Sequence, residues 1–233
     1  MQSNRARQKS MAYLGAYQKH LEKFKNKSPL MFEIGCGYPQ SDQPEGALGM
    51  GGSLSMFQQW LGHGTKIIGI DILPSCREFQ DPDNNIFIEI GSQSDSEFMT
   101  GLVDKYGEPD IILDDGSHVE KDLIDSFNTL YPHLKTNGVY IVEDCGGNHI
   151  SSGLPFDDSE RFLGFAMKHV LAMNQFYAKN RLARAKNIEQ ENFRASNIGF
   201  MLSNISFYPD LVIFEKGLNV PIDQMVAPAH YFF

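Results

Sequence analysis

The sequence predicts an α/β fold: a mostly parallel sheet with helices on both faces and an antiparallel hairpin near the C-terminal end. Three observations support this prediction. Short apolar runs that end in acidic or glycine-rich turns recur along the chain and alternate with amphipathic segments, as in parallel sheets. The stretch from Pro109 to Asp144 has the pattern of a complete strand, helix and strand. Residues 204–217 have the pattern of two strands joined by a tight turn.

Length and composition fit one domain of this kind. The chain has 233 residues, 42% of them hydrophobic, which suffices for one α/β core with appended elements. Its net charge of −9 argues against binding nucleic acid by phosphate neutralisation. Its three cysteines include no Cys-x-x-Cys pair, which indicates neither a zinc site nor a disulfide framework. With no leader signal and no apolar run of membrane-spanning length, we expect a cytoplasmic protein that does not associate with membranes.

The central strand, helix and strand deliver acidic side chains to one edge of the predicted sheet. The first strand opens onto Asp114, Asp115 and, three residues later, His118. The second strand ends at Glu143 and Asp144. Because a right-handed crossover places both strands in one sheet, we expect Asp115, His118 and the Glu-Asp pair along the same rim. For any one of these residues a helix cap remains the alternative.

Residues 1–29 form a separate amphipathic element. Apolar and aromatic side chains, among them Tyr13, Tyr17 and Leu21, recur at three- and four-residue spacing between Lys, Gln and Glu. We expect this helix to cover one side of the sheet or to form a subunit contact in a homo-oligomer, in preference to a direct substrate role.

The first three strands have the features of a cofactor site. The first runs into Glu-Ile-Gly-Cys-Gly at residues 33–37, where glycines let backbone amides approach a ligand closely. We interpret the long loop over residues 38–52 as a wall of the active site. Asp71 ends the second strand at the position that binds ribose hydroxyls, with a turn Asp as the alternative. Gln93 and Ser94 follow the third strand where an adenine ring would lie.

Taken together, these motifs resemble the class I S-adenosylmethionine (SAM) methyltransferases. Within that class they are similar to the metal-dependent sugar O-methyltransferases of the mycinamicin and macrocin type and to the cephalosporin-hydroxylase-like group. The motifs that carry the resemblance are Phe-Glu-Ile-Gly-Cys-Gly (32–37), Gly-Gly-Ser-Leu (51–54), Gly-Ile-Asp-Ile (69–72), Gly-Ser-Gln-Ser-Asp (91–95), Asp-Asp-Gly-Ser-His (114–118), Val-Glu-Asp (142–144) and Val-Ile-Phe-Glu-Lys (212–216).

The resemblance implies a Rossmann-like, seven-stranded sheet and a division of the chain. Residues 30–217 would be the SAM-binding catalytic domain, with an acceptor-side insertion at about 146–204 that does not align. Residues 218–233 would be a C-terminal tail.

The resemblance also implies roles for particular residues. Asp115, Glu143 and Asp144 would hold Mg²⁺ or Mn²⁺. Asp115 and His118 would be the catalytic residues, and His118 would take the proton of a metal-bound sugar hydroxyl as its oxygen attacks the SAM methyl group in line. Three carboxylates at one edge would repel one another without a hard cation, and an oxygen-only set favours Mg²⁺, Mn²⁺ or Ca²⁺ over Zn²⁺. The residues implied in SAM binding are Glu33, Gly35, Gly37, Ser53, Asp71, Gln93, Ser94 and Asp114.

The acceptor is expected to be a small-molecule carbohydrate. A composition rich in Asn, Lys and Ile favours a surface-polysaccharide or nucleotide-activated sugar over a macrolide sugar. A basic cluster is either a solvated helix face or a contact for a diphosphate-bearing acceptor; its members are Lys179, Arg181, Arg184, Lys186 and Arg194. Two other functions remain as alternatives: an NAD-dependent oxidoreductase, which has no use for the acidic rim, and a catalytically silent SAM-binding subunit.

Overall fold

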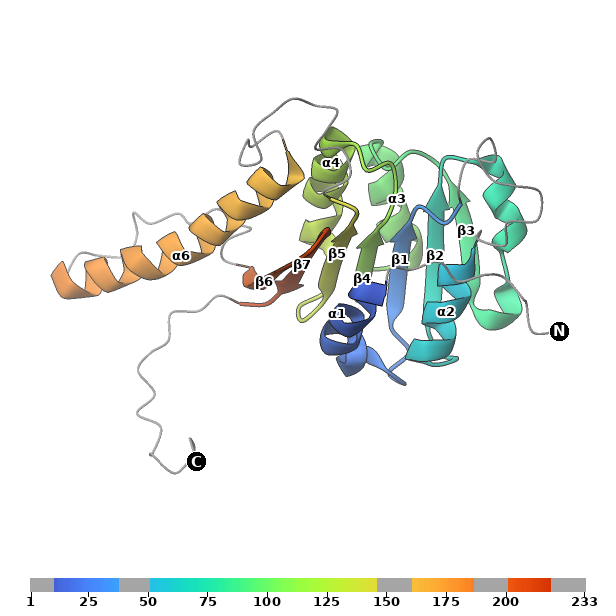
Figure 1. The fold of residues 1–233 in the computed structure, drawn as a ribbon, viewed down its shortest axis with the longest axis horizontal. Coiled ribbons are helices and arrows are strands. Elements are labelled where there is room, and N and C mark those ends of the chain that lie inside the picture. The colour runs from blue at the N-terminus through green and yellow to red at the C-terminus, as the bar shows by residue number, and fades with distance from the viewer. Residues whose placement is uncertain (1–10, 38–50, 146–160, 187–200, 219–233) are drawn as a thin grey trace.

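The computed structural model describes residues 11–37, 51–145, 161–186 and 201–218 (Figure 1). The strands among them form one seven-stranded sheet in the order β3-β2-β1-β4-β5-β7-β6. The first five strands are parallel, and β7 pairs antiparallel with both β5 and β6. This topology confirms the predicted fold. The strands are β1 (Leu30–Ile34), β2 (Lys66–Asp71), β3 (Ile86–Ile90), β4 (Ile111–Asp114), β5 (Val139–Glu143), β6 (Leu202–Tyr208) and β7 (Leu211–Lys216).

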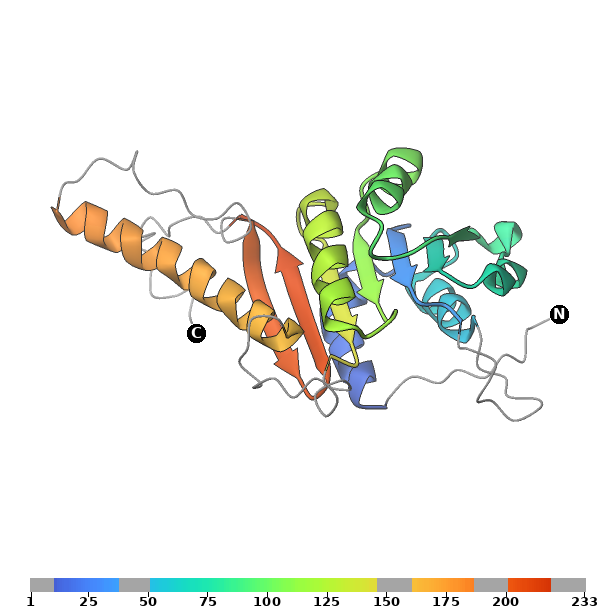
Figure 2. The ribbon, with the colours of Figure 1, turned by 90° about the horizontal axis from the view of Figure 1, so that it is seen from above.

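Helices cover both faces of the sheet (Figures 1 and 2). One core lies under α1 and α2, and the other lies under α3, α4 and the start of α6. Both views show α6 leaving the body of the molecule beyond the hairpin. The helices are α1 (Met11–Leu21), α2 (Gly52–Leu61), α3 (Ser96–Tyr106), α4 (Glu120–Leu130) and α6 (Phe162–Lys186), and the 3-10 helices are η1 (Glu22–Phe24), η3 (Pro74–Phe79), η4 (Pro82–Asn84) and η5 (Tyr131–His133).

The strand pleat decides which core each strand residue enters. Successive side chains of a strand point to opposite faces of the sheet. In β5, Val139 and Ile141 enter the core under α1 and α2, whereas Tyr140 and Val142 enter the other core. By the same alternation Glu143, at the end of β5, points to the α1 side.

Several predicted element bounds change in the structure. The predicted N-terminal helix is described from Met11, and a 3-10 turn continues it to Phe24. α2 begins at Gly52 after a left-handed Gly51 with φ of 69°, and no side chain caps its first turn. Residues 38–50, 146–160 and 219–233 lie outside the described residues, as does much of the predicted acceptor-side insertion. None of the described helices combines the length and apolar character needed to cross a bilayer.

Candidate functional site

Three of the rim residues lie together beyond the ends of β4 and β5. Ligand atoms of Asp115, His118 and Asp144 lie within 4.8 Å of one another. His118 Nε2 is 3.9 Å from Asp115 Oδ1, and the side chains of Asp115 and His118 are 24% and 32% exposed. The cluster therefore combines an imidazole and two carboxylates at a place that a ligand can reach.

Two members of this cluster have a left-handed backbone. The φ angles are 54° at His118 and 50° at Asp144. Asp and His are among the non-glycine residues that adopt this conformation most often, and five other described non-glycine residues also have a positive φ. The left-handed backbone therefore turns these two side chains at the strand ends but does not by itself mark a site.

Glu143 is more enclosed than the rest of the rim, and two tyrosines of α1 reach it and its neighbour. Glu143 is only 2% exposed, and the Tyr17 hydroxyl donates a hydrogen bond to its Oε1. The Tyr13 hydroxyl donates to Asp144 Oδ1 at 2.6 Å. Burial, reinforced by these acids, raises the pKa of both phenols far above the usual range, so both remain donors.

The two tyrosines offer a second explanation for the acids at this edge. The sequence predicts that three carboxylates here repel one another without a cation, but Tyr13 and Tyr17 stabilise two of them directly. The sequence did contain a signal for this role, because the two phenols stand four residues apart on the helix face that becomes buried.

Gly35 brings the glycine loop against the acidic rim. Its φ is 82°, and a Cβ atom at this position would lie 2.0 Å from the carbonyl oxygen of Asp115. The Asp115 amide also donates to the Ile34 carbonyl at 2.9 Å. Only glycine permits this approach, so the predicted cofactor loop lies directly against the rim.

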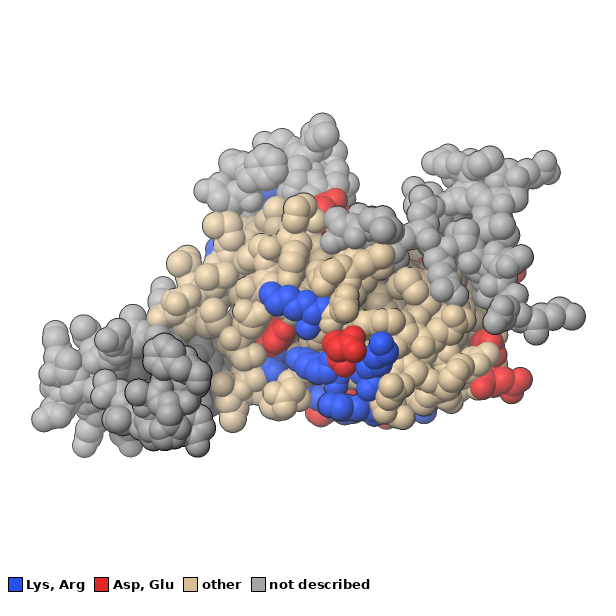
Figure 3. All heavy atoms as spheres, turned by 60° about the horizontal axis from the view of Figure 1, so that its bottom comes forward, with Lys and Arg blue, Asp and Glu red and all other residues tan. Residues whose placement is uncertain are grey.

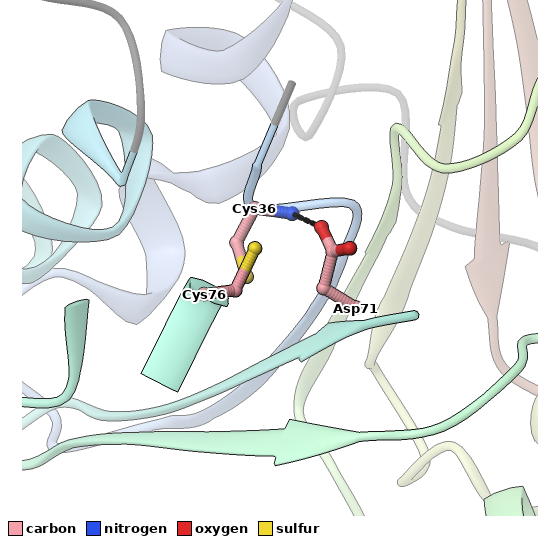
Figure 4. Close-up of side chains that lie close together, drawn as sticks. All are labelled: Cys36, Asp71 and Cys76. Atoms are coloured by element: carbon pink, nitrogen blue, oxygen red, sulfur yellow. Dashed lines mark hydrogen bonds between the residues drawn. The ribbon is translucent and has the colours of Figure 1, made fainter. Parts of the chain in front are cut away.

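Asp71 holds the glycine loop in place. Its Oδ2 accepts hydrogen bonds from the amides of Cys36 (3.0 Å) and Gly37 (2.8 Å), and its Oδ1 accepts one from Leu73 (2.9 Å). Figure 4 shows the Cys36 and Cys76 sulfurs side by side next to this carboxylate. Hydrogen bonding to Cys76, together with burial, raises the pKa of the Cys36 thiol. Because backbone amides engage both Asp71 oxygens, we interpret this buried group as support for the loop. The ribose contact stays a prediction.

Asp114 and Gln93 lie beneath the rim. Asp114 is completely buried and points to the α4 side, where it accepts hydrogen bonds from Ser126 (2.5 Å), Gln93 (3.1 Å) and Tyr140 (3.3 Å). Burial raises the pKa of Asp114 to about 6. Gln93 Oε1 accepts from the Ser117 amide at 2.7 Å. Asp114 and Gln93, both predicted to contact SAM, thus support the Asp-Gly-Ser-His loop from beneath the rim.

The remaining predicted SAM contacts also have partners within the chain. Glu33 is fully buried at the end of β1 and accepts a hydrogen bond from the Ser53 hydroxyl at the start of α2. The exposed Ser94 donates to Asp122 Oδ1 at 2.7 Å. These contacts link β1 to α2 and the turn after β3 to α4.

A cleft opens between α1 and α2. Its volume is about 540 Å³, within the range of small-molecule sites. Tyr17 lines it and also contacts Glu143, so the cleft adjoins the buried side of the rim. The lining residues are Leu14, Tyr17, Gln18, Met56, Phe57, Gln59 and Trp60.

The predicted basic cluster is only partly within the described residues. Four members of the cluster lie between residues 179 and 186, in the last turns of α6, where side chains are not described. The fifth, Arg194, lies outside the described residues. Figure 3 shows other Lys and Arg side chains gathered around a few acids on the lower face of Figure 1, although the net charge is −9. Because the side chains of the predicted cluster itself are not described, its contact with a diphosphate stays a prediction.

Comparison with known proteins finds sugar O-methyltransferases, although no protein-family model matches the chain. The 8-demethyl-8-alpha-L-rhamnosyl tetracenomycin-C 2'-O-methyltransferase of Streptomyces olivaceus is 29% identical over 209 residues, which are 89% of this chain and 50% of that protein. The demethylmacrocin O-methyltransferase of Streptomyces fradiae is 34% identical over 128 residues, which are 55% of this chain and 30% of that protein.

A solved structure extends the similarity to the fold. The MycE methyltransferase from the mycinamycin biosynthetic pathway, in complex with Mg and S-adenosylhomocysteine (SAH), superimposes with a TM-score of 0.74 at 25% identity. The match covers 91% of this chain and 51% of MycE. The chain is related to these sugar O-methyltransferases and has the class I methyltransferase fold. It spans about half the length, or less, of the relatives it matches.

Proposed function

We propose that this class I methyltransferase relative is a SAM-dependent, divalent-metal-dependent O-methyltransferase that acts on a sugar hydroxyl of a small-molecule acceptor. The observation that carries the proposal is the cluster of Asp115, His118 and Asp144 at the carboxyl ends of β4 and β5, directly against the glycine loop. The relatives named above methylate sugars of glycosylated natural products, which makes this acceptor class our first choice. A nucleotide-activated or surface-polysaccharide sugar is the alternative within the same chemistry.

The donor set fits a hard divalent cation. Asp115 and Asp144 contribute carboxylate oxygens that lie close enough to share one ion. Glu143, which precedes Asp144 and lies outside that cluster, would add a third carboxylate. Such ligands favour Mg²⁺ or Mn²⁺. Related MycE was solved with Mg and SAH. When bound, the ion would supply positive charge that lowers the pKa of an acceptor hydroxyl.

His118 would act as the general base. Its imidazole is partly exposed, so an acceptor can reach it, and Asp115 lies 3.9 Å from Nε2. The neighbouring carboxylate stabilises the imidazolium that forms when His118 takes the hydroxyl proton. The loop over residues 33–37, held by Asp71, would place the SAM methyl group in front of the oxygen that His118 has deprotonated.

Methyl transfer to a panel of glycosylated polyketides and nucleotide sugars, measured as SAH release with MgCl₂ or with EDTA, tests the proposal. We expect turnover that EDTA abolishes. His118→Ala should lower kcat by about 10²–10⁴-fold, because a positioned general base contributes that much. The exposed His63 offers a matched control, and His63→Ala should leave kcat unchanged.

Two outcomes would contradict parts of this proposal. Turnover that survives EDTA would remove the metal from the mechanism. Calorimetry that detects NAD binding but no SAH binding would replace the methyltransferase with an oxidoreductase.

A further inference from the structure

α1 carries polar side chains on its buried face. Tyr13, Tyr17 and His20 follow one another at helical spacing and are 5%, 3% and 2% exposed, beside the buried Ala16 and Leu21. An amphipathic helix that only covers a sheet presents apolar side chains to it. Buried polar groups need hydrogen-bond partners, so the identity of those partners shows what this face of α1 does.

The partners of the two tyrosines are the acids at the end of β5. The Tyr13 hydroxyl donates to Asp144 Oδ1 at 2.6 Å, and the Tyr17 hydroxyl donates to Glu143 Oε1. Each bond crosses more than a hundred residues of sequence. The tyrosines therefore contact two of the three carboxylates that we assign to the metal.

The third polar residue anchors the other end of α1. His20 Nδ1 lies 2.5 Å from Glu215 Oε1, and Nε2 lies 2.9 Å from the Tyr208 hydroxyl. Glu215 of β7 pairs with Val139, the first residue of β5, whereas the two tyrosines contact its far end. The helix is thus tied to the hairpin through His20 and to the end of β5 through the two tyrosines.

The phenols are themselves held rigidly. The Tyr17 ring packs edge-on against Phe57 with centroids 5.4 Å apart and against Tyr13 at 6.3 Å. A fixed donor restricts the rotation of the carboxylate that accepts from it. The restriction applies to Asp144 through Tyr13 and to Glu143 through Tyr17.

We propose, given the function above, that Tyr13 and Tyr17 are positioning residues that orient Asp144 and Glu143 for the divalent cation. Hydrogen bonds from a second layer of residues orient metal ligands, and their loss typically costs 10–100-fold in metal affinity. The N-terminal helix is then part of the metal site rather than a cover for the sheet alone.

Metal binding by the full chain tests this inference without reference to turnover. Mn²⁺ affinity would be measured by electron paramagnetic resonance in the presence of SAH for Tyr13→Phe, Tyr17→Phe and the wild type. Each substitution removes only a hydroxyl, and we expect roughly 10-fold weaker Mn²⁺ binding with unchanged SAH affinity. Tyr208→Phe is the matched control, since it removes a hydroxyl that bonds α1 at His20 but touches neither acid. It should bind Mn²⁺ as the wild type does.

The outcomes separate this inference from the proposed function. If the wild type binds Mn²⁺ and both folded variants bind it equally well or more tightly, the positioning role is overturned and the metal site stands. If Tyr208→Phe weakens binding as much as the other two, the effect belongs to the seating of α1, and the specific role is again overturned. If the wild type binds no Mn²⁺, the metal-dependent function fails and the inference with it. Thermal unfolding confirms that each variant is folded. If one of the two tyrosine variants does not fold, the other alone suffices for the test.

Discussion

Gly35→Ala adds one methyl group at the contact between the glycine loop and the acidic rim. The new Cβ would lie 2.0 Å from the Asp115 carbonyl oxygen, 2.6 Å from its carbonyl carbon and 2.8 Å from Gly116 Cα. These are backbone atoms that cannot rotate away. The left-handed φ of 82° costs an alanine about 1–2 kcal/mol, and overpacking costs about 1–3 kcal/mol. We expect the free energy of unfolding to fall by about 2–5 kcal/mol.

Urea unfolding and calorimetry with SAH measure the two consequences. Gly35→Ala should lower the urea midpoint and weaken SAH binding, because the loop must move away from the rim to admit the methyl group. Gly101→Ala is the control: this residue lies on the exposed side of α3, and a Cβ there meets no heavy atom within 4 Å. Alanine is the better helix former, so the control should gain about 0.5–1 kcal/mol. A Gly35→Ala protein with the wild-type midpoint and SAH affinity would refute the reasoning.

Two further predictions concern buried charges. Burial raises the pKa of Asp114 to about 6 from 3.8, so the unfolded chain releases this proton first as the pH rises. This carboxyl therefore lowers stability progressively between about pH 4 and pH 6, by up to ~3 kcal/mol, and Asp114→Asn should remove that decline from urea midpoints measured across this range. Lys216 Nζ donates to three backbone carbonyls within residues 131–134. Lys216→Met should cost about 2–3 kcal/mol by leaving them unpaired, whereas exposed Lys27→Met should cost almost nothing, and equal midpoints for the two variants would contradict this account.

Local sequence patterns predict the parallel strands and the antiparallel hairpin, whereas the seven-stranded sheet is what the resemblance to known methyltransferases implies. A short apolar run followed by turn residues predicts a buried strand and not a surface helix. The strands, and the acidic side chains at their ends, can therefore be predicted from residues close together in the chain. The parallel sheet, the antiparallel hairpin and the presence of Asp115, His118 and Asp144 on one rim all belong to this level. Gly35 belongs to it as well, because a glycine directly after a strand indicates a close backbone approach.

Tertiary structure decided which side of the sheet each polar group serves. Asp114 and Asp115 are neighbours in sequence, yet one is completely buried against α4 and the other is 24% exposed on the rim, because the pleat and the strand end turn them apart. Periodicity predicts that α1 has a buried face but not what that face meets. Its contacts with Asp144 and Glu143 span 131 and 126 residues, and only the packing of the helix along β5 brings those groups together.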